Sequence, residues 1–246
     1  MFAFIQARMG SKRLPCKMSL ILPDGKTLLE AVIHRLKLHD VSPVLLTTQN
    51  SADDALAIKA NSLQIPVFRG DETNVISRFT KAGEEFGVAA DDYVLRICAD
   101  NPHLSHYIID QTLTACKNTP NKDYISFGYS GKPGIRHHTG IFVEAAKFGA
   151  LQSLLPLNND WFNEHVTNGL YENPKKYAIQ ILDIPVEWHT DFEKIRLTID
   201  DEDDWNFCLE TYPLLSPLDF PEQRNLLLSR KNWINLMENQ IIKYQK

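Results

Sequence analysis

Apolar runs and amphipathic segments alternate through the first half of the chain. Short apolar or β-branched runs predict buried strands, and segments with apolar positions at helical spacing predict the helices between them. The predicted strands span residues 2–5, 43–48, 66–68 and 93–98, and the predicted helices span residues 27–37, 52–61, 74–86 and 107–116. This alternation indicates a mainly parallel sheet with helices on both faces, whose ligands bind beyond the carboxyl ends of the strands.

The second half of the chain is less regular. Strands are predicted at residues 124–127, 139–143, 177–182 and 194–199, and helices at residues 144–154, 160–171 and 203–211. Apolar residues at helical spacing predict one amphipathic helix over residues 222–244, packed on the body of the protein. Because no repeat, low-complexity tract or linker is visible, we expect one domain over residues 1–246.

Composition narrows the class of protein. A chain of 246 residues that is 43% hydrophobic can bury a sizeable core, and a net charge of −5 argues against a surface that binds nucleic acid throughout. The four cysteines lie far apart, which is typical of reduced thiols. The first apolar stretch is too short for a signal peptide, and none approaches the ~18 apolar residues of a spanning helix. We therefore expect a cytoplasmic protein with no nucleic-acid or membrane partner.

A basic loop follows the first predicted strand. Residues 8–17 hold four cations among ten residues, whereas the whole chain has 26 among 246. Gly10 and Ser11 at its centre allow a tight turn that points N–H groups inward. Because a nucleoside triphosphate carries about four negative charges, this loop suits its binding, and a solvated charged loop is the alternative. The spacing fits neither a P-loop nor a G-x-G-x-x-G dinucleotide motif. The four cations are Arg8, Lys12, Arg13 and Lys17.

Five motifs in order resemble those of the cytidylyltransferase family, which includes the CMP–acylneuraminate and CMP–Kdo synthetases. The match is closest to the spore coat polysaccharide biosynthesis branch, and it covers residues 5 to 200. It is specific for the family but not for a substrate. The motifs are the opening run at residues 5–17, F-R-G-D with V-I-S-R at 68–71 and 75–78, R-I-C-A-D-N-P at 96–102, E-H-V-T at 164–167 and R-L-T-I-D at 196–200.

The resemblance implies a fold and a reaction. The fold is a three-layer α/β/α nucleotide-diphospho-sugar transferase fold, Rossmann-like and related to GT-A, with a mainly parallel central sheet. The implied activity is that of a nucleotidyltransferase, which transfers CMP from CTP to an acidic sugar and releases pyrophosphate for cell-surface or spore-coat polysaccharide biosynthesis. A smaller, partly antiparallel portion at about residues 124–182 is expected to bind the sugar and support a homodimer.

Two aspartates each follow a predicted strand, so both are expected at the same edge of the sheet. Asp100 follows residues 93–98 and Asp200 follows residues 194–199. Taken alone, each suits a helix cap or a turn. Because the related enzymes have metal ligands at both positions, the resemblance implies that these carboxylates hold Mg²⁺, with Mn²⁺ as the other candidate; Mg²⁺ prefers such hard oxygen ligands.

The resemblance also implies roles for further side chains. Arg8, Arg13 and Lys17 are the expected catalytic cations, with Lys17 or Arg13 on the phosphate that is transferred. Sugar contacts are expected from Glu144, Glu164 and His165, although Glu144 also suits the start of a helix. The expected nucleotide-binding residues are Gln6, Ala7, Arg8, Gly10, Ser11, Lys12, Arg13, Lys17, Thr48 and Arg78.

Three departures from the family pattern keep two other functions open. Ala99 replaces the usual glycine and places a methyl group where a phosphate should pass, and Asn163 replaces a common arginine. Residues 201–204 add negative charge beside the expected triphosphate. Asp201 and Asp203 also have the D-x-D spacing of a GT-A glycosyltransferase, which would not need the basic loop. Ala99 and Asn163 motivate the third possibility, a non-catalytic nucleotide-binding module.

Overall fold

A single mixed sheet forms the centre of the computed structural model, which describes residues 1–155 and 165–244. The strand order is β3-β2-β1-β4-β7-β5-β6, with β8 also paired to β5. The first four strands run parallel, and β7 lies antiparallel between β4 and β5. The strands are β1 (Phe2–Gln6), β2 (Ser42–Thr48), β3 (Val67–Gly70), β4 (Tyr93–Cys98), β5 (Tyr124–Tyr129), β6 (Lys132–Pro133), β7 (Glu144–Lys147) and β8 (Ile179–Asp183).

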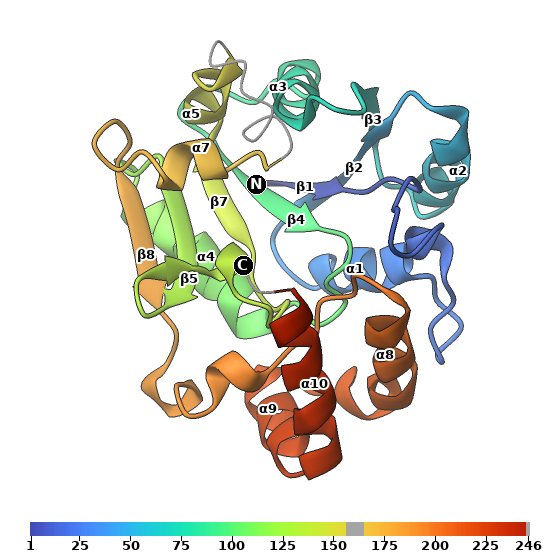
Figure 1. Ribbon diagram of the computed structural model, residues 1–246. Helices are drawn as coiled ribbons and strands as arrows, with labels where there is room; N and C mark the ends of the chain where they lie inside the picture. The colour runs from blue at the N-terminus through green and yellow to red at the C-terminus, as the bar shows by residue number, and fades with distance from the viewer. Residues whose placement is uncertain (156–164, 245–246) are drawn as a thin grey trace.

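Helices cover both faces of this sheet and make three layers, as Figure 1 shows. The helices α3, α5 and α7 cover one face, whereas α1, α4 and the C-terminal helices cover the other. The three-layer α/β architecture agrees with the predicted fold. The described helices are α1 (Leu28–Leu36), α2 (Asp54–Ser62), α3 (Val75–Glu85), α4 (His106–Asn118), α5 (Phe148–Gln152), α7 (Asn168–Tyr171), α8 (Glu202–Leu215), α9 (Phe220–Leu228) and α10 (Lys231–Lys243).

Local sequence accounts for several of these boundaries. Thr27 and Glu30 form a reciprocal capping box at the start of α1, and Asn74 accepts a hydrogen bond from Ser77 N–H at the start of α3. The central strand β1 is apolar from Phe2 to Ile5 because its side chains enter two cores in alternation. Phe4 packs against α3, and Ile5 faces the core on the opposite side of the sheet.

The second half corrects the predicted elements. Residues 139–143 are not a strand, and the strand β7 begins instead at Glu144, where a helix was predicted. Glu144 interrupts the apolar residues at this boundary, and a carboxylate there also suits the first turn of a helix, so the sequence pattern could not locate the strand. In the predicted strand 194–199, Lys194 ends a 3₁₀ helix and residues 195–199 belong to no strand of the sheet. The predicted tail helix is two helices, α9 and α10. No described helix is long and apolar enough to cross a membrane.

Candidate functional site

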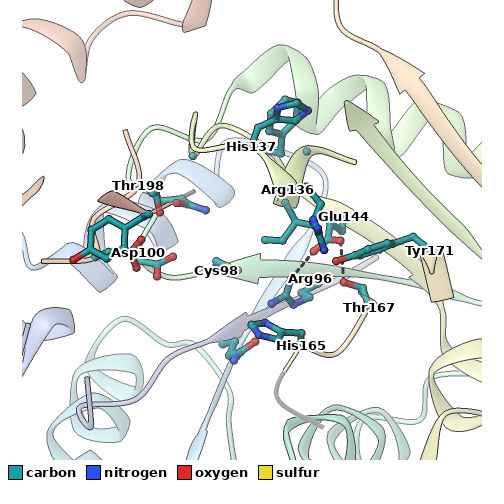
Figure 2. Close-up of a pocket in the computed structure, with 18 of the residues that line it drawn as sticks. Arg96, Cys98, Asp100, Arg136, His137, Glu144, His165, Thr167, Tyr171 and Thr198 are labelled. Atoms are coloured by element: carbon teal, nitrogen blue, oxygen red, sulfur yellow. Dashed lines mark hydrogen bonds and ion pairs between the residues drawn. The ribbon is translucent and has the colours of Figure 1, made fainter. Parts of the chain in front are cut away.

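A cavity of about 700 Å³ lies at the carboxyl ends of β1 and β4. The chain leaves β1 toward β2 and returns to β4 on the other side of β1, so the cavity lies at a switch point of the sheet, where α/β proteins bind ligands. Figure 2 shows Asp100 and Thr198 at one end of it, Arg96 and Glu144 at the other, and Cys98 between them. Its volume is that of a site for a small molecule.

Lys17 joins the two candidate metal ligands at one end of the cavity. Its Nζ lies 3.0 Å from Asp100 Oδ2 and 4.0 Å from Asp200 Oδ1, and it donates to the Ile199 carbonyl at 2.7 Å. The left-handed conformation of Cys16 (φ 55°) precedes the short 3₁₀ helix Lys17–Ser19, which buries the lysine. The loop therefore places one ammonium group against two carboxylates.

Asp200 also forms ion pairs with two arginines. Arg13 Nη2 lies 2.8 Å from Asp200 Oδ1, and Arg196 Nη2 lies 3.0 Å from Asp200 Oδ2. The side chain of Arg13 is 51% exposed, whereas that of Arg196 is 1% exposed and also pairs with Asp204 at 2.6 Å. Because a solvent-exposed ion pair is worth little, Arg13 can exchange this carboxylate for a phosphate at low cost.

Of the predicted nucleotide loop, Gln6 and Arg13 line the cavity, and the other residues of the loop lie outside its lining. Gln6 lines the cavity, whereas Ala7 is buried and its N–H donates to the Leu46 carbonyl at 3.2 Å. The Ser11 hydroxyl accepts from Leu14 N–H at 3.3 Å and so closes the turn. Three predicted nucleotide-binding residues, Arg8, Gly10 and Lys12, lie on the exposed side of the loop.

Thr48 and Arg78 lie behind the loop, and neither lines the cavity. The Thr48 hydroxyl donates to the buried carboxylate of Asp53, which also accepts from Met9 N–H at 2.7 Å. Thr48 thus supports the loop through Asp53. Arg78 donates to the Asp71 carbonyl at 2.8 Å, and burial, with the nearby charge of Arg8, lowers the pKa of Arg78 to about 10.

Ala99 does not place its methyl group in the cavity. Its side chain is 2% exposed and belongs to the hydrophobic core. Its N–H donates to the Gln6 carbonyl at 3.3 Å, which continues the pairing of β4 with β1. The expected conflict between this methyl group and a phosphate is therefore absent in the described part of the chain. Asn163, the other departure near the site, lies outside the described residues.

A buried ion pair forms the other end of the cavity. Arg96 and Glu144 lie directly opposite each other on β4 and β7, and Arg96 Nη1 lies 2.5 Å from Glu144 Oε2. The second oxygen, Oε1, accepts from the Tyr124 hydroxyl at 2.5 Å and from the Thr167 hydroxyl at 2.9 Å. Burial, together with the charge of Glu144, raises the pKa of Tyr124 well above its usual value. Glu144 is thus held in a fixed and neutralised network.

Further polar side chains surround this pair. His165 lines the cavity, and Glu164 lies outside the described residues. Arg136 lines it as well and lies 3.5 Å from Glu172. Burial lowers the pKa of His137, so this imidazole is neutral near pH 7.

Four residues that line the cavity carry a buried polar atom without a partner among the described residues. Native proteins rarely leave such atoms unpaired, so they indicate a ligand or water in this region. Close approach of the backbone shapes the same wall, because Gly140 has φ 67° and a Cβ there would lie 2.7 Å from Thr198 N. The four atoms are Gln6 Oε1, Arg96 Nε, Asn101 Oδ1 and His137 Nε2.

Sequence reasoning missed several residues of this cavity. The sequence pattern could have indicated Arg96, because this charged residue lies within an apolar strand and its neighbours Leu95 and Ile97 are fully buried. Lys243 and Tyr244 had no such signal, since they lie in an exposed stretch at the end of α10. Neither is near the predicted motifs in sequence, and only the packing of α10 brings them to the cavity.

The donor set at Asp100 and Asp200 fits a magnesium ion. Both carboxylates line one cavity and share one cationic partner, and their side chains are 28% and 15% exposed. No group of three or more metal-ligating side chains was found among the described residues. Since Mg²⁺ usually takes one or two protein carboxylates and completes its shell with phosphates and water, two suffice.

Comparisons with known proteins match most of the chain. The cytidylyltransferase family model matches residues 2–234. An uncharacterized protein of Methanocaldococcus jannaschii is 37% identical over 212 residues, which cover 84% of this chain and 80% of that protein. The spore coat polysaccharide biosynthesis protein SpsF of Bacillus subtilis is 28% identical over 215 residues, which cover 85% of this chain and 84% of that protein.

Solved structures share the fold. A cytidylyltransferase from Leptospira borgpetersenii matches with a TM-score of 0.80 and 25% identity, over 94% of this chain and 95% of that one. The structure of CMP:2-keto-3-deoxy-manno-octonic acid synthetase complexed with CTP matches with a TM-score of 0.57 and 14% identity, over 87% of this chain and 97% of that one.

Proposed function

The chain belongs to the cytidylyltransferase family, and from that premise we propose that it transfers CMP from CTP to a hydroxyl group of an acidic sugar and releases pyrophosphate. The observation that carries the proposal is the position of Lys17 between Asp100 and Asp200 at one end of a cavity of about 700 Å³. Cations and carboxylates converge there, at the edge of the sheet where a triphosphate and a metal ion would meet.

In the proposed reaction, a sugar hydroxyl oxygen attacks the α-phosphate in line, and the bond to the β-phosphate oxygen breaks to release pyrophosphate. Arg8, Arg13 and Lys17 neutralise the triphosphate, with Lys17 or Arg13 on the transferred phosphate. Asp100 and Asp200 would hold Mg²⁺ or Mn²⁺, which supplies charge neutralisation on the phosphates. The protein performs no covalent chemistry, because positioning and charge supply the rate.

The sugar is proposed to occupy the end of the cavity near Arg96 and Glu144. Glu144 neutralises the buried Arg96, whereas the half-exposed Arg136 pairs with Glu172 at 3.5 Å near the surface and can exchange that partner for a sugar carboxylate. Glu144, Glu164 and His165 remain the proposed sugar contacts. The similarity to the spore coat protein supports a role in cell-surface polysaccharide biosynthesis. We further propose a cytoplasmic homodimer, with residues 124–182 providing sugar and dimer contacts.

The positions of Asp201 and Asp203 argue against the glycosyltransferase alternative, which needs them as a D-x-D carboxylate pair in the site. Asp201 and Asp203 both pair with Lys243, at 2.7 and 3.2 Å, and neither lines the cavity. Asp201 also accepts from Asp204 N–H and caps the helix α8. These two carboxylates therefore stabilise the start of α8 and bind the lysine at the end of α10.

Release of pyrophosphate tests the proposal. The purified protein is incubated with Mg²⁺, each nucleoside triphosphate in turn and a panel of acidic and neutral sugars. We expect release with CTP and an acidic sugar, loss of release in Asp100→Asn and normal release in Asp91→Asn, whose side chain is 96% exposed. Turnover only with a preformed nucleotide sugar would instead identify a glycosyltransferase, and nucleotide binding without turnover on any sugar would identify a binding module.

A further inference from the structure

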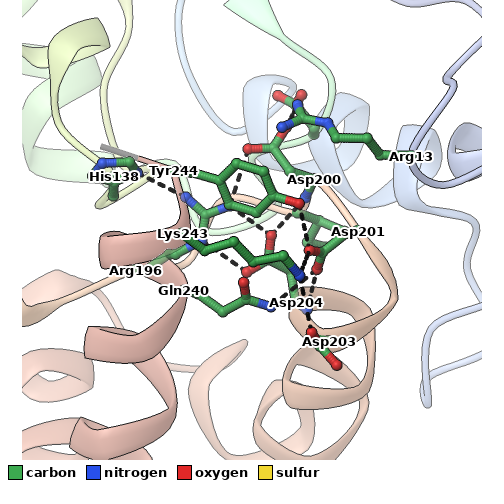
Figure 3. A network of polar contacts seen from close by, with 12 residues as sticks. Arg13, His138, Arg196, Asp200, Asp201, Asp203, Asp204, Gln240, Lys243 and Tyr244 are labelled. Carbon is green, nitrogen blue, oxygen red and sulfur yellow. Dashed lines mark hydrogen bonds and ion pairs between the residues drawn. The ribbon is translucent and has the colours of Figure 1, made fainter. Parts of the chain in front are cut away.

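The end of α10 forms part of the wall of the cavity. Lys243 and Tyr244 both line it, beside Arg13 and Asp200 (Figure 3). The match to the family model ends at residue 234, so these two residues lie beyond the region that the chain shares with that model. The match to the family model therefore does not cover these two residues of the site.

Buried apolar side chains fix the position of this helix end. Trp233 is 0% exposed and Met237 is 2% exposed, and both pack into the main hydrophobic core. One turn further along, Gln240 is 9% exposed and donates to Asp201 Oδ1 at 3.1 Å. The helix is thus anchored on three successive turns before it reaches the cavity.

Asp201 ties this helix end to the site. Its Oδ2 accepts from Lys243 Nζ at 2.7 Å and from the Tyr244 hydroxyl at 2.6 Å. Its Oδ1 accepts from Gln240 and from Asp204 N–H. Because Asp201 directly follows Asp200, the three hydrogen bonds from Gln240, Lys243 and Tyr244 fix the end of α10 against a candidate metal ligand.

The ring of Tyr244 contacts the two arginines that pair with Asp200. The Arg13 guanidinium carbon lies 4.7 Å from the ring centroid, and the Arg196 guanidinium carbon lies 5.1 Å from it. Both distances are within the range of a cation–π interaction. Arg196 is buried and held by Asp204, whereas Arg13 is exposed and belongs to the basic loop. The ring therefore restricts the direction of the one arginine that is free to move.

The same segment compensates the acidic run beside the site. Lys243 pairs with both Asp201 and Asp203, and Arg196 pairs with Asp204. Without Lys243, the net charge of this acidic run would be more negative by one, and its repulsion of a nearby triphosphate would increase. The unusual acidic sequence at residues 201–204 and the basic, aromatic end of α10 thus form one unit.

We propose that Tyr244 is a positioning residue that aims Arg13 at the triphosphate, and that Lys243 and Tyr244 complete the triphosphate-binding end of the site. This inference rests on the proposed function. When the triphosphate binds, Arg13 releases Asp200 and donates to a phosphate oxygen while its guanidinium stays on the face of the ring. The ring thus raises the affinity for CTP without contacting the sugar.

Titration calorimetry with Mg²⁺ and CTP tests the inference on Tyr244→Ala and Tyr244→Phe. Tyr244→Ala is expected to weaken CTP binding about 10-fold, because Arg13 loses its support. Tyr244→Phe keeps the ring and should retain most of the affinity. Ile242→Ala, at a position on the same helix end that is 67% exposed, is the matched control and should bind as the wild type does. Thermal unfolding checks that each variant folds.

Coupling with Arg13 separates positioning from a merely structural role. If Tyr244 acts through Arg13, then Arg13→Ala combined with Tyr244→Ala should bind CTP no more weakly than Arg13→Ala alone. In turnover, Tyr244→Ala should raise the KM for CTP and leave the KM for the sugar unchanged. Unchanged or tighter CTP binding in Tyr244→Ala, or effects of the two substitutions that multiply fully, would overturn the inference.

Inorganic tripolyphosphate serves as a second probe that is independent of the nucleoside. Wild-type protein that binds tripolyphosphate but neither binds nor cleaves CTP would contradict the proposed function. The inference would still be tested in that case, by comparing how tightly the Tyr244 and Arg13 variants bind tripolyphosphate. Wild-type protein that binds neither ligand would contradict both. Equal tripolyphosphate binding by the wild type and Tyr244→Ala would overturn the inference alone.

Discussion

The two ends of the cavity are both built on ion pairs, but they differ in burial. At the proposed triphosphate end, the side chain of Asp100 is 28% exposed and Asp200 pairs with Arg13, whose side chain is 51% exposed. At the proposed sugar end, the side chains of Arg96 and Glu144 are 7% and 4% exposed, and both oxygens of Glu144 are occupied. Side chains at the proposed triphosphate end can exchange their ion-pair partners for a ligand, whereas the side chains at the proposed sugar end stay fixed in place.

This difference has an energetic basis. The Arg13 side chain is half-exposed, so solvent screens its pair with Asp200 in part, and exchange of this carboxylate for a phosphate is expected to cost less than breaking a fully buried pair. A buried pair leaves an uncompensated charge when one partner is removed, which is strongly unfavourable. Substitutions at the sugar end should therefore act mainly on stability, and substitutions at the triphosphate end should act mainly on ligand binding and turnover.

The largest expected effect is on stability at the sugar end. Glu144→Ala removes the partner of a buried arginine and should lower the free energy of unfolding by about 3–5 kcal/mol. Urea denaturation at pH 7 measures this change. Asp91→Ala, which breaks the exposed pair with Lys147, is the control and should change stability by less than about 0.5 kcal/mol. A loss of unfolding free energy below about 1 kcal/mol in Glu144→Ala would contradict the expected difference in stability between the two ends.

The next effect is on turnover at the triphosphate end. Lys17→Ala removes the ammonium group between Asp100 and Asp200 and should lower kcat about 100- to 1000-fold, as expected for a preorganised charge. Lys26→Ala, which removes a surface partner of Asp24, is the control. Rates of pyrophosphate release measure both. A change in kcat below about 3-fold for Lys17→Ala would exclude a catalytic role for this lysine.

A smaller effect is expected at Arg13. Arg13→Ala should weaken CTP binding by at least ~1.5 kcal/mol, because it removes a charge-assisted hydrogen bond. Stability should change by less than about 0.5 kcal/mol, since the side chain is exposed. Titration calorimetry and urea denaturation measure the two quantities on the same sample. Unchanged affinity for CTP would show that Arg13 does not bind the triphosphate.

The smallest effect concerns acid stability beside the triphosphate end. Burial raises the pKa of Asp201, but hydrogen bonds from Lys243 and Tyr244 outweigh it and hold the pKa well below its usual value. Because the folded-state pKa lies below the unfolded value of about 3.9, Asp201 contributes stability above that pH and loses it as the pH falls further. Asp201→Asn should flatten the decline in unfolding free energy below about pH 5. An unchanged pH profile would contradict this account.

The sequence was sufficient for the family and for the core of the fold. The strand at Tyr93–Cys98 was predicted with its observed bounds, and membership of the cytidylyltransferase family is confirmed. The antiparallel strand β7 was missed because Glu144, a carboxylate between the apolar Val143 and Ala145, also suits the first turn of a helix. Its pattern therefore did not distinguish a strand that begins at Glu144 from a helix that begins there.

Prediction of the site was limited by side-chain direction and by distant packing. Thr48 ends a strand beside the loop, but its hydroxyl points to Asp53 instead of the cavity, and strand position alone could not reveal this. Tyr244 reaches the cavity only because Trp233 and Met237 anchor α10 in the core. Helical periodicity indicates which face of a helix is buried but not where its end lies. The functional roles of the individual residues remain predictions.

Transfer of labelled CMP tests the central claim most directly. The protein is incubated with Mg²⁺, an acidic sugar and CTP that carries a label in either its α- or its γ-phosphate. The account predicts that the α label appears in a sugar nucleotide and the γ label in pyrophosphate, in equal amounts, and that Asp100→Asn abolishes both. A γ label on the sugar, or an α label that never appears in a sugar nucleotide with any sugar, would contradict it.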